Sequence, residues 1–250
     1  MPPDVLDLGL IDYDEAWRLQ EAYASQISRG ERSPTLLLLE HPHIYTFGTG
    51  GHAENILWSE QQLRERGVSV RWVDRGGDVT YHGPGQLVGY PLVPLGSIAA
   101  PSAETDLSTE NAVRVPRADY VGYIRKLERM LIMALAPLGV AGAQIPRLTG
   151  VWVQPDVYSR CSRCRPEDRK KPAKLAAIGV RIDSHGISRH GFALNVNPDM
   201  SYWDGIIACG LSEYPLVSLS DLLASAPSID QVKRLVADSF RQLFDSASGS

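Results

Sequence analysis

Apolar side chains recur at steps of three and four residues in three stretches of the chain, which is the spacing of one helix face. The first stretch, residues 12–29, has Asp12 as its N-cap and Glu15 in the capping-box position, and Gly30 ends it. The second carries Val121, Ile124, Leu127, Leu131, Leu135 and Leu138. The third follows the cap residue Ser228 and carries Val232, Leu235, Val236, Phe240 and Leu243. We predict a helix for each stretch.

Short apolar runs between these stretches predict β-strands. They lie at 35–40, 68–74, 151–153, 175–182 and 191–197. The sequence DSHGISRH separates the last two runs and predicts a hairpin, and a capping box at Ser59 and Gln62 opens a short helix that ends at Gly67. Residues 94–116 are rich in Pro, Ser, Thr and Ala and predict a long surface loop. Without an internal repeat or an obvious linker, we expect residues 1–250 to form one domain.

Composition narrows the function classes. The 250 residues are 44% hydrophobic, which is enough for a full core, and their net charge of −4 argues against a nucleic-acid surface. The first residues contain four aspartates and no basic segment before an apolar run, so we expect no secretory signal and a cytoplasmic location. The most apolar segment, 131–143, is interrupted by Pro137 and Gly139 and is too short to span a bilayer.

Glycines are concentrated in RGGDVTYHGPGQ, residues 75–86. A nucleotide-binding P-loop needs GxxxxGK[ST], and this stretch contains no lysine, so the pattern does not favour ATP. A plain turn would explain Gly83 and Gly85. Because Arg75, Thr80 and His82 lie in the same stretch, we favour a polar wall of a ligand site.

Cys209 and Lys174 are the candidate reactive residues. A single cysteine is most often a buried small hydrophobe, but Ala208 and Gly210 leave this thiol uncrowded, as a nucleophile requires. Lys174 begins KLAAIGVRI and either points to water at a strand edge or enters a pocket, where its charge would lower the pKa of a cysteine. The sequence leaves these two readings of Lys174 balanced.

Cys161 and Cys164 form a CxxC pair, which could be half of a zinc site. The sequence contains no second CxxC and no paired histidines at ligand spacing, so this interpretation is weakly supported. Three cysteines in a chain of this kind favour free thiols or a metal over structural disulfides. The pair lies in a segment that we interpret as a mobile insertion. Between Arg160 and Lys174 seven basic residues stand against two acidic ones, either as a solvated face or as a contact for an acidic partner.

The chain contains, in this order, EHPHIYTFG, RGGDVTYHGPGQ, KLAAIG, HGFALNVNPD and ACGL. This set resembles the lipoyl(octanoyl) transferase family, which moves octanoyl groups from acyl carrier protein to proteins in lipoate biosynthesis. The resemblance runs from about Leu36 to Leu223. It implies an α/β fold with a mixed sheet flanked by helices, as in the catalytic domains of biotin and lipoate protein ligases.

The resemblance makes Cys209 the acyl-thioester nucleophile and Lys174 the residue that lowers its pKa and moves protons. It gives the lining of the substrate site as Arg75, Gly76, Gly77, Asp78, Val79, Thr80, Tyr81, His82, Ala177, Ile178, Gly179, Gly191, Phe192 and Ala193. Two departures stand out: Ala208 replaces the proline common in the family, and extra residues are present near 97–117 and 155–172.

The implied partners are octanoyl-acyl carrier protein and the lipoyl domains of 2-oxoacid dehydrogenase complexes and of the glycine cleavage H protein. No cofactor, metal, nucleic acid or membrane is expected, and we expect a monomer. An ATP-dependent lipoate or biotin ligase ranks second, because it would leave Cys209 without a role. A fatty-acyl or metal-binding module that uses the CxxC pair ranks third, and a cysteine hydrolase would release free octanoate.

Overall fold

The computed structural model describes residues 2–95, 119–159, 161–208 and 214–245. Within them, a seven-stranded mixed sheet has the order β1-β2-β6-β10-β9-β8-β7, in which β1 and β2 are parallel and the other pairs are antiparallel. Its strands are β1 (Asp4–Leu10), β2 (Thr35–Glu40), β6 (Gln86–Leu92), β7 (Gly142–Ile145), β8 (Leu148–Val153), β9 (Ala173–Ile182) and β10 (Ser188–Asn195). This arrangement confirms the expected α/β fold with a mixed sheet flanked by helices.

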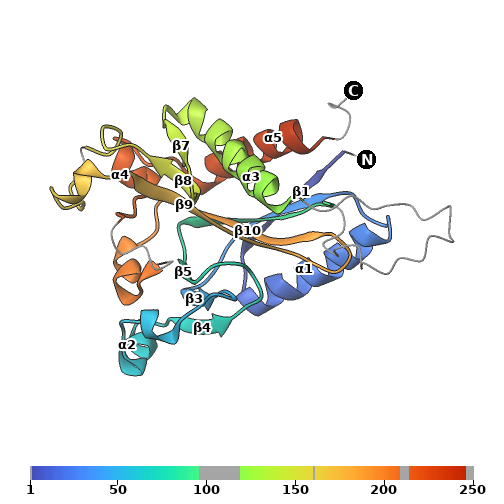
Figure 1. Cartoon of the computed structure of the whole chain (residues 1–250), viewed down its shortest axis with the longest axis horizontal. Helices are drawn as coiled ribbons and strands as arrows, with labels where there is room; N and C mark the ends of the chain where they lie inside the picture. Colours follow the sequence, from blue (N-terminus) through green and yellow to red (C-terminus); the bar gives the residue numbers. More distant parts are fainter. Residues whose placement is uncertain (1, 96–118, 160, 209–213, 246–250) are drawn as a thin grey trace.

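Helices cover both faces of this sheet (Figure 1). They are α1 (Tyr13–Ser28), α3 (Tyr120–Leu135) and α5 (Ile229–Phe244). Strand β2 shows the division: Leu36 and Leu38 pack on the side of α3 and α5, whereas Leu37 and Leu39 pack on the side of α1. Because both faces are covered, β2 is an unbroken apolar run rather than an alternating one.

A second, three-stranded sheet lies beside the first (Figure 1). It has the order β4-β3-β5 and consists of β3 (Ile44–Phe47), β4 (Ser69–Trp72) and β5 (Val79–His82), with the short helix α2 (Glu60–Glu65) nearby. Backbone N–H groups of Gly48, Thr49 and Gly50 donate to carbonyls of the loop at 75–78. A Cβ on Gly48 would lie 2.3 Å from the Gly77 oxygen, so this close approach requires glycine there.

Several predicted boundaries are confirmed, and others are wrong. Asp12 caps α1 by accepting from Asp14 and Glu15, and the capping box at Ser59 is present. Neither β5, which spans Val79–His82 in the middle of RGGDVTYHGPGQ, nor β6, which begins at its last residue Gln86, was predicted as a strand. The hydrophobic pattern also missed β1, β3 and β7. The predicted loop at 94–116 lies almost wholly outside the described residues.

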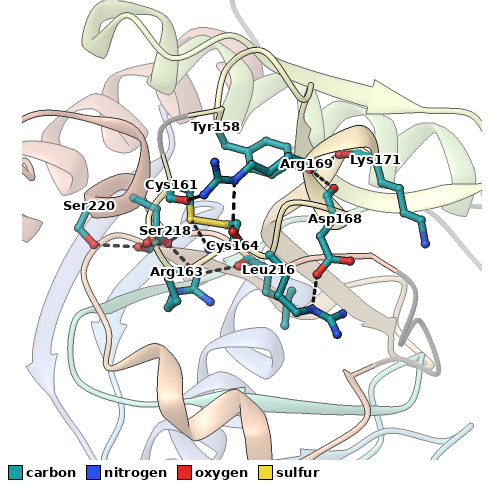
Figure 2. Close-up of a disulfide and its surroundings, with 12 residues drawn as sticks. Tyr158, Cys161, Arg163, Cys164, Asp168, Arg169, Lys171, Leu216, Ser218 and Ser220 are labelled. Carbon is teal, nitrogen blue, oxygen red and sulfur yellow. Dashed lines mark hydrogen bonds and ion pairs between the residues drawn. A yellow bond between two sulfur atoms is a disulfide. The ribbon is translucent and has the colours of Figure 1, made fainter.

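Figure 2 shows a disulfide between Cys161 and Cys164, both of which are buried. The expectation of free thiols or a zinc ligand pair here is therefore wrong, because adjacent CxxC sulfurs can bond to each other without a metal. The segment is also packed rather than projecting, since the Tyr158 ring is buried beside it and its hydroxyl donates to the carbonyls of Asp168 and Lys171. None of the helices in the described ranges is long and apolar enough to cross a bilayer.

Candidate active site

Two neighbouring cavities occupy the region between the two sheets. The narrow cavity has a volume of about 50 Å³. It is lined by Tyr13, Arg75, Gly76, Gly77, Thr80, His82, Tyr90, Ala177, Ile178, Gly179, His190, Gly191, Phe192 and Ala193. Eleven of these fourteen residues belong to the predicted substrate site, so the structure brings together three sequence motifs that lie far apart in the chain.

The wide cavity has a volume of about 350 Å³. It is lined by Leu57, Thr80, Trp152, Lys174, Ala177, Trp203, Asp204, Ile206, Ile207, Ala208, Tyr214 and Leu216. Thr80 and Ala177 line both cavities, so the two spaces meet at these residues.

The floor of the narrow cavity is made by small residues on β9 and β10. Ala177 pairs directly with Ala193, and Gly179 pairs with Gly191. A Cβ on Gly179 would lie 3.0 Å from the Gly76 oxygen and 3.1 Å from Cδ of Arg75. Glycine at this position therefore lets the loop at 75–77 approach the sheet closely, and the cavity between them is a narrow channel.

The loop at 75–77 forms the opposite wall. Nη2 of Arg75 donates to the backbone oxygen of Thr46 at 2.5 Å and to its hydroxyl at 3.1 Å, while Nη1 donates to the Gly76 oxygen at 3.0 Å. The N–H of Gly76 donates to the Val180 oxygen at 3.0 Å. Because these donors already have acceptors within the protein, this glycine loop differs from a P-loop, whose N–H groups point at phosphate.

Buried histidines lie on the far side of the narrow cavity: His82 and His190 line it, and His41 packs against His82. Burial lowers the pKa of His41 to about 4 and holds the pKa of His82 well below its usual value, with the neighbouring His41 contributing to the latter. The His82 ring also hydrogen-bonds Gln86 at 2.9 Å. These imidazoles are therefore neutral at pH 7, and we assign His82 no role as a charged partner of the cysteine.

His190 closes the same wall in an uncommon backbone conformation, with φ of 56°. Its N–H donates to the Gln20 side chain at 2.7 Å, and its Nε2 lies 2.7 Å from Asp74. Burial would raise the pKa of Asp74, but the His190 hydrogen bond and the charges of Arg189 and Arg181 lower it to about 2. Burial lowers the pKa of His190, so the pair consists of a neutral imidazole and a carboxylate.

Lys174 is turned into the wide cavity and is only 7% exposed. Its Nζ lies 4.9 Å from the centre of the Trp152 ring, and among the described residues Lys174 forms no ion pair with a carboxylate. The register of β8 against β9 shifts between Val151 and Trp152, so that Trp152 pairs directly with Lys174. This position matches the second interpretation of Lys174, in which its side chain enters a pocket. An irregularity in strand pairing beside a site commonly directs a side chain into that site.

Cys209 lies outside the described residues. The residue before it, Ala208, and the next described residue after it, Tyr214, both line the wide cavity together with Lys174. Tyr214 also packs edge-on against Trp152, with ring centres 5.3 Å apart. The described chain therefore reaches the wall of the Lys174 cavity on both sides of the candidate nucleophile.

Three predicted lining residues lie elsewhere: two of them because side chains alternate along β5, and Asp78 because it precedes that strand and pairs with another loop. Val79 and Tyr81 point into the core of the small sheet, and the carboxylate of Asp78 accepts hydrogen bonds from His52 and Asn55. The prediction of one continuous lining from 75 to 82 ignored this alternation.

Sequence reasoning also missed Tyr13, Tyr90 and His190 in the narrow cavity and Trp152 in the wide one. His190 directly precedes Gly191 and could have been found as part of that motif. No local signal marked the other three. In the described ranges, no group of three or more His, Cys, Asp or Glu side chains is placed to hold a metal ion.

Comparisons with known proteins identify the family of this chain. The lipoyl protein ligase A/B catalytic domain family matches residues 12–241. An octanoyltransferase of Rubrobacter xylanophilus is 40% identical over 236 residues, covering 94% of this chain and 90% of the relative. An octanoyltransferase of Solibacter usitatus is 39% identical over 238 residues, covering 95% and 91%.

Among solved structures, a bipartite lipoate protein ligase from Thermoplasma acidophilum has a TM-score of 0.64 at 16% identity, covering 97% of this chain and 82% of that one. This likeness shows the fold. The match of the family over most of the chain, with relatives near 40% identity, shows more: the chain belongs to the lipoyl protein ligase A/B catalytic domain family and groups within it with the octanoyltransferases.

Proposed function

We propose that this protein transfers an octanoyl group from octanoyl-acyl carrier protein to a lysine of a lipoyl domain, through a thioester on Cys209. The relatives named octanoyltransferase support the reaction class. The observation that carries the mechanism is the buried Lys174 in a cavity whose wall includes Ala208, next to a channel floored by alanine and glycine.

In the first half-reaction the Cys209 thiolate attacks the thioester carbonyl of the acylated phosphopantetheine arm. An ammonium at Lys174 favours the thiolate and so lowers the thiol pKa. An aromatic face, unlike a carboxylate, stabilises the ammonium without neutralising it, so the charge of Lys174 remains available to the thiolate. One thioester replaces another, and no ATP is consumed.

The narrow cavity is the place for the alkyl chain. Burial of seven carbons beyond the carbonyl, at ~0.8 kcal/mol each, would contribute roughly 5 kcal/mol to binding. Its walls of neutral imidazole and small residues also exclude water, which would otherwise hydrolyse the acyl-enzyme.

In the second half-reaction an acceptor lysine amine attacks the acyl-enzyme. The tetrahedral intermediate loses a proton from nitrogen as it collapses to the amide, and the Cys209 thiolate leaves. In the first half-reaction the Lys174 ammonium gives its proton to the departing pantetheine thiolate, and the neutral amine that results takes up the proton from nitrogen and returns to its charged form. No cofactor takes part in either step. We further expect the enzyme to act as a monomer in the cytoplasm, on the lipoyl domains of 2-oxoacid dehydrogenase complexes and of the glycine cleavage H protein.

Intact-protein mass spectrometry tests this proposal. Wild-type protein and Cys209→Ser are incubated with octanoyl-acyl carrier protein without ATP, then with hydroxylamine or with an unmodified lipoyl domain. We expect a hydroxylamine-labile octanoyl adduct on wild type alone, which the lipoyl domain discharges. Modification that appears only with free octanoate and ATP would assign the protein to the ligases instead, and release of free octanoate in the presence of acceptor would make it a hydrolase.

A further inference from the structure

Within the described residues, the wall of the wide cavity contains buried hydrogen-bond donors that have no acceptor. In the part of the chain that the structure describes, these are the hydroxyl of Thr80 and the indole N–H groups of Trp152 and Trp203. Most buried polar groups in proteins are paired, so unpaired ones call for an explanation. Together with the Lys174 ammonium they place four donor groups on a wall that also includes Asp204, and these donors suit a ligand that brings acceptor oxygens.

Thr80 differs from the two tryptophans because it lines both cavities. Alternation along β5 turns Thr80 and His82 towards the cavities while Val79 and Tyr81 enter the core. The His82 ring already bonds Gln86, whereas the Thr80 hydroxyl, on a residue that is only 6% exposed, has no partner among the described residues. As far as the structure describes the chain, Thr80 is thus a donor without an acceptor at the junction of the channel and the Lys174 cavity.

The junction is where the acyl carbonyl must lie, if the proposed function holds and the alkyl chain occupies the narrow cavity. The carbonyl is the first atom group beyond the chain, and its sulfur must remain on the side of Lys174 and Ala208. We propose that Thr80 is a catalytic residue whose hydroxyl donates a hydrogen bond to the carbonyl oxygen of the thioester as that oxygen becomes negatively charged.

The step is balanced without a further reactant. The Cys209 thiolate forms a C–S bond to the carbonyl carbon, and the carbonyl π electrons move to oxygen, where the Thr80 hydroxyl hydrogen-bonds the oxyanion without transferring its proton. When the carbonyl re-forms, the bond to the pantetheine sulfur breaks and that thiolate leaves with the charge that Cys209 brought. A donor held in place before the reaction stabilises this intermediate more than the neutral thioester, so it raises the rate rather than substrate affinity alone.

Thr80→Val tests the assignment, because it removes the hydroxyl and keeps the shape and the strand preference of the side chain. In single-turnover acylation by octanoyl-acyl carrier protein, we expect the rate at saturating carrier to fall about 10²–10³-fold, with little change in KM. Thr80→Ser, which keeps the hydroxyl, is expected to retain most of the wild-type rate. The thermal midpoint of Thr80→Val should stay equal or rise, since the hydroxyl that is lost is buried and unpaired.

Thr35→Val is the matched control. Thr35 is equally buried in β2, its hydroxyl donates to the Ser33 oxygen at 2.8 Å, and it lines neither cavity, so its loss should leave acylation unchanged. A saturating rate for Thr80→Val within threefold of wild type, or an equal loss in Thr80→Ser, would overturn the role of Thr80. Absence of any adduct on wild type would instead reject the proposed function, so the two failures are distinguishable.

Discussion

Two buried lysines show how surroundings decide what a side chain can do. Lys233 on α5 is 8% exposed and lies 2.8 Å from Asp7, whose pKa is lowered: burial works against ionisation of that carboxyl, but the hydrogen bonds from Lys233 and Gly9 favour it. Lys174 is as well buried, yet it faces an aromatic ring in a cavity. The charge of Lys233 is neutralised by its partner, whereas the charge of Lys174 is directed at whatever enters the cavity.

We therefore expect Lys174→Ala to slow formation of the acyl-enzyme by at least about 100-fold while the fold is retained, since a positioned proton carrier typically contributes 10²–10⁴-fold. Lys233→Ala is the matched control: it should lower stability and leave the acylation rate within threefold. Stopped single-turnover mixtures read by mass spectrometry give the rate, and circular dichroism gives the fold. Equal rates for Lys174→Ala and wild type would remove Lys174 from the mechanism.

The segment at 155–172 is a compact element that rests on backbone contacts as much as on its disulfide (Figure 2). The Arg169 guanidinium donates to the backbone oxygens of Cys161 and Cys164, and Arg163 donates to the Leu216 oxygen and to Asp221, each at 2.8 Å. Leu216 lines the wide cavity, so the segment is joined to the site through the backbone rather than through a sulfur.

This arrangement predicts a purely structural disulfide. Cys161→Ser/Cys164→Ser should lower the free energy of unfolding by about 2 kcal/mol, the value for opening a loop of four residues, and leave acylation within threefold of wild type. Urea unfolding of the variant, and of wild type with reductant, measures the first quantity. If wild type binds stoichiometric zinc and the variant does not, the disulfide is contradicted and the CxxC pair is a metal-binding site.

Part of the basic excess in this segment is used internally. Arg163 pairs with Asp221, and Arg165 pairs with Asp168 and Glu167. Contact of the remaining positive charge with an acidic partner stays a prediction.

At the scale of the whole molecule, the buried histidines His41, His82 and His190 lie beside the candidate site. Their burial makes the free energy of unfolding depend on pH. The pKa of His41 is about 4 in the fold against 6.5 when unfolded, and the pKa values of His82 and His190 are lowered as well. Between these pKa values the unfolded chain binds more protons than the folded one. Stability is therefore full above pH 6.5 and is lost as the pH falls towards 4.

From pH 7 to pH 5 we expect the free energy of unfolding to fall by about 2 kcal/mol on account of His41 alone, with His82 and His190 adding to the loss. His41→Gln cannot titrate, so it should lose about 2 kcal/mol less than wild type over this range, although it is less stable at pH 7. Urea titrations at several pH values measure both slopes. Parallel slopes for the two proteins would show that His41 is not the titrating group.

Local sequence patterns predicted much of the fold. Helix caps at Asp12, Ser59 and Ser228 lie where their residue types predicted, because a cap is a contact between residues three positions apart. Strand β2 matches its apolar run, 35–40, since burial on both faces leaves an unbroken signature in the sequence. β1 was missed because its polar and apolar residues are half-buried at a sheet edge.

The ordered motifs in the sequence were sufficient to identify the family and most of the residues around the narrow cavity, because those residues lie in contiguous segments. They could not place Tyr13 from α1 against β10, or Trp152 beside Lys174, because such contacts join positions far apart in the chain and leave no local pattern. The unpaired state of the Thr80 hydroxyl is likewise a property of its neighbours in space. The sequence by itself determines which chemical groups the chain carries. The packing of sheets and helices decides which of these groups are buried, which are hydrogen-bonded and which lie close to one another.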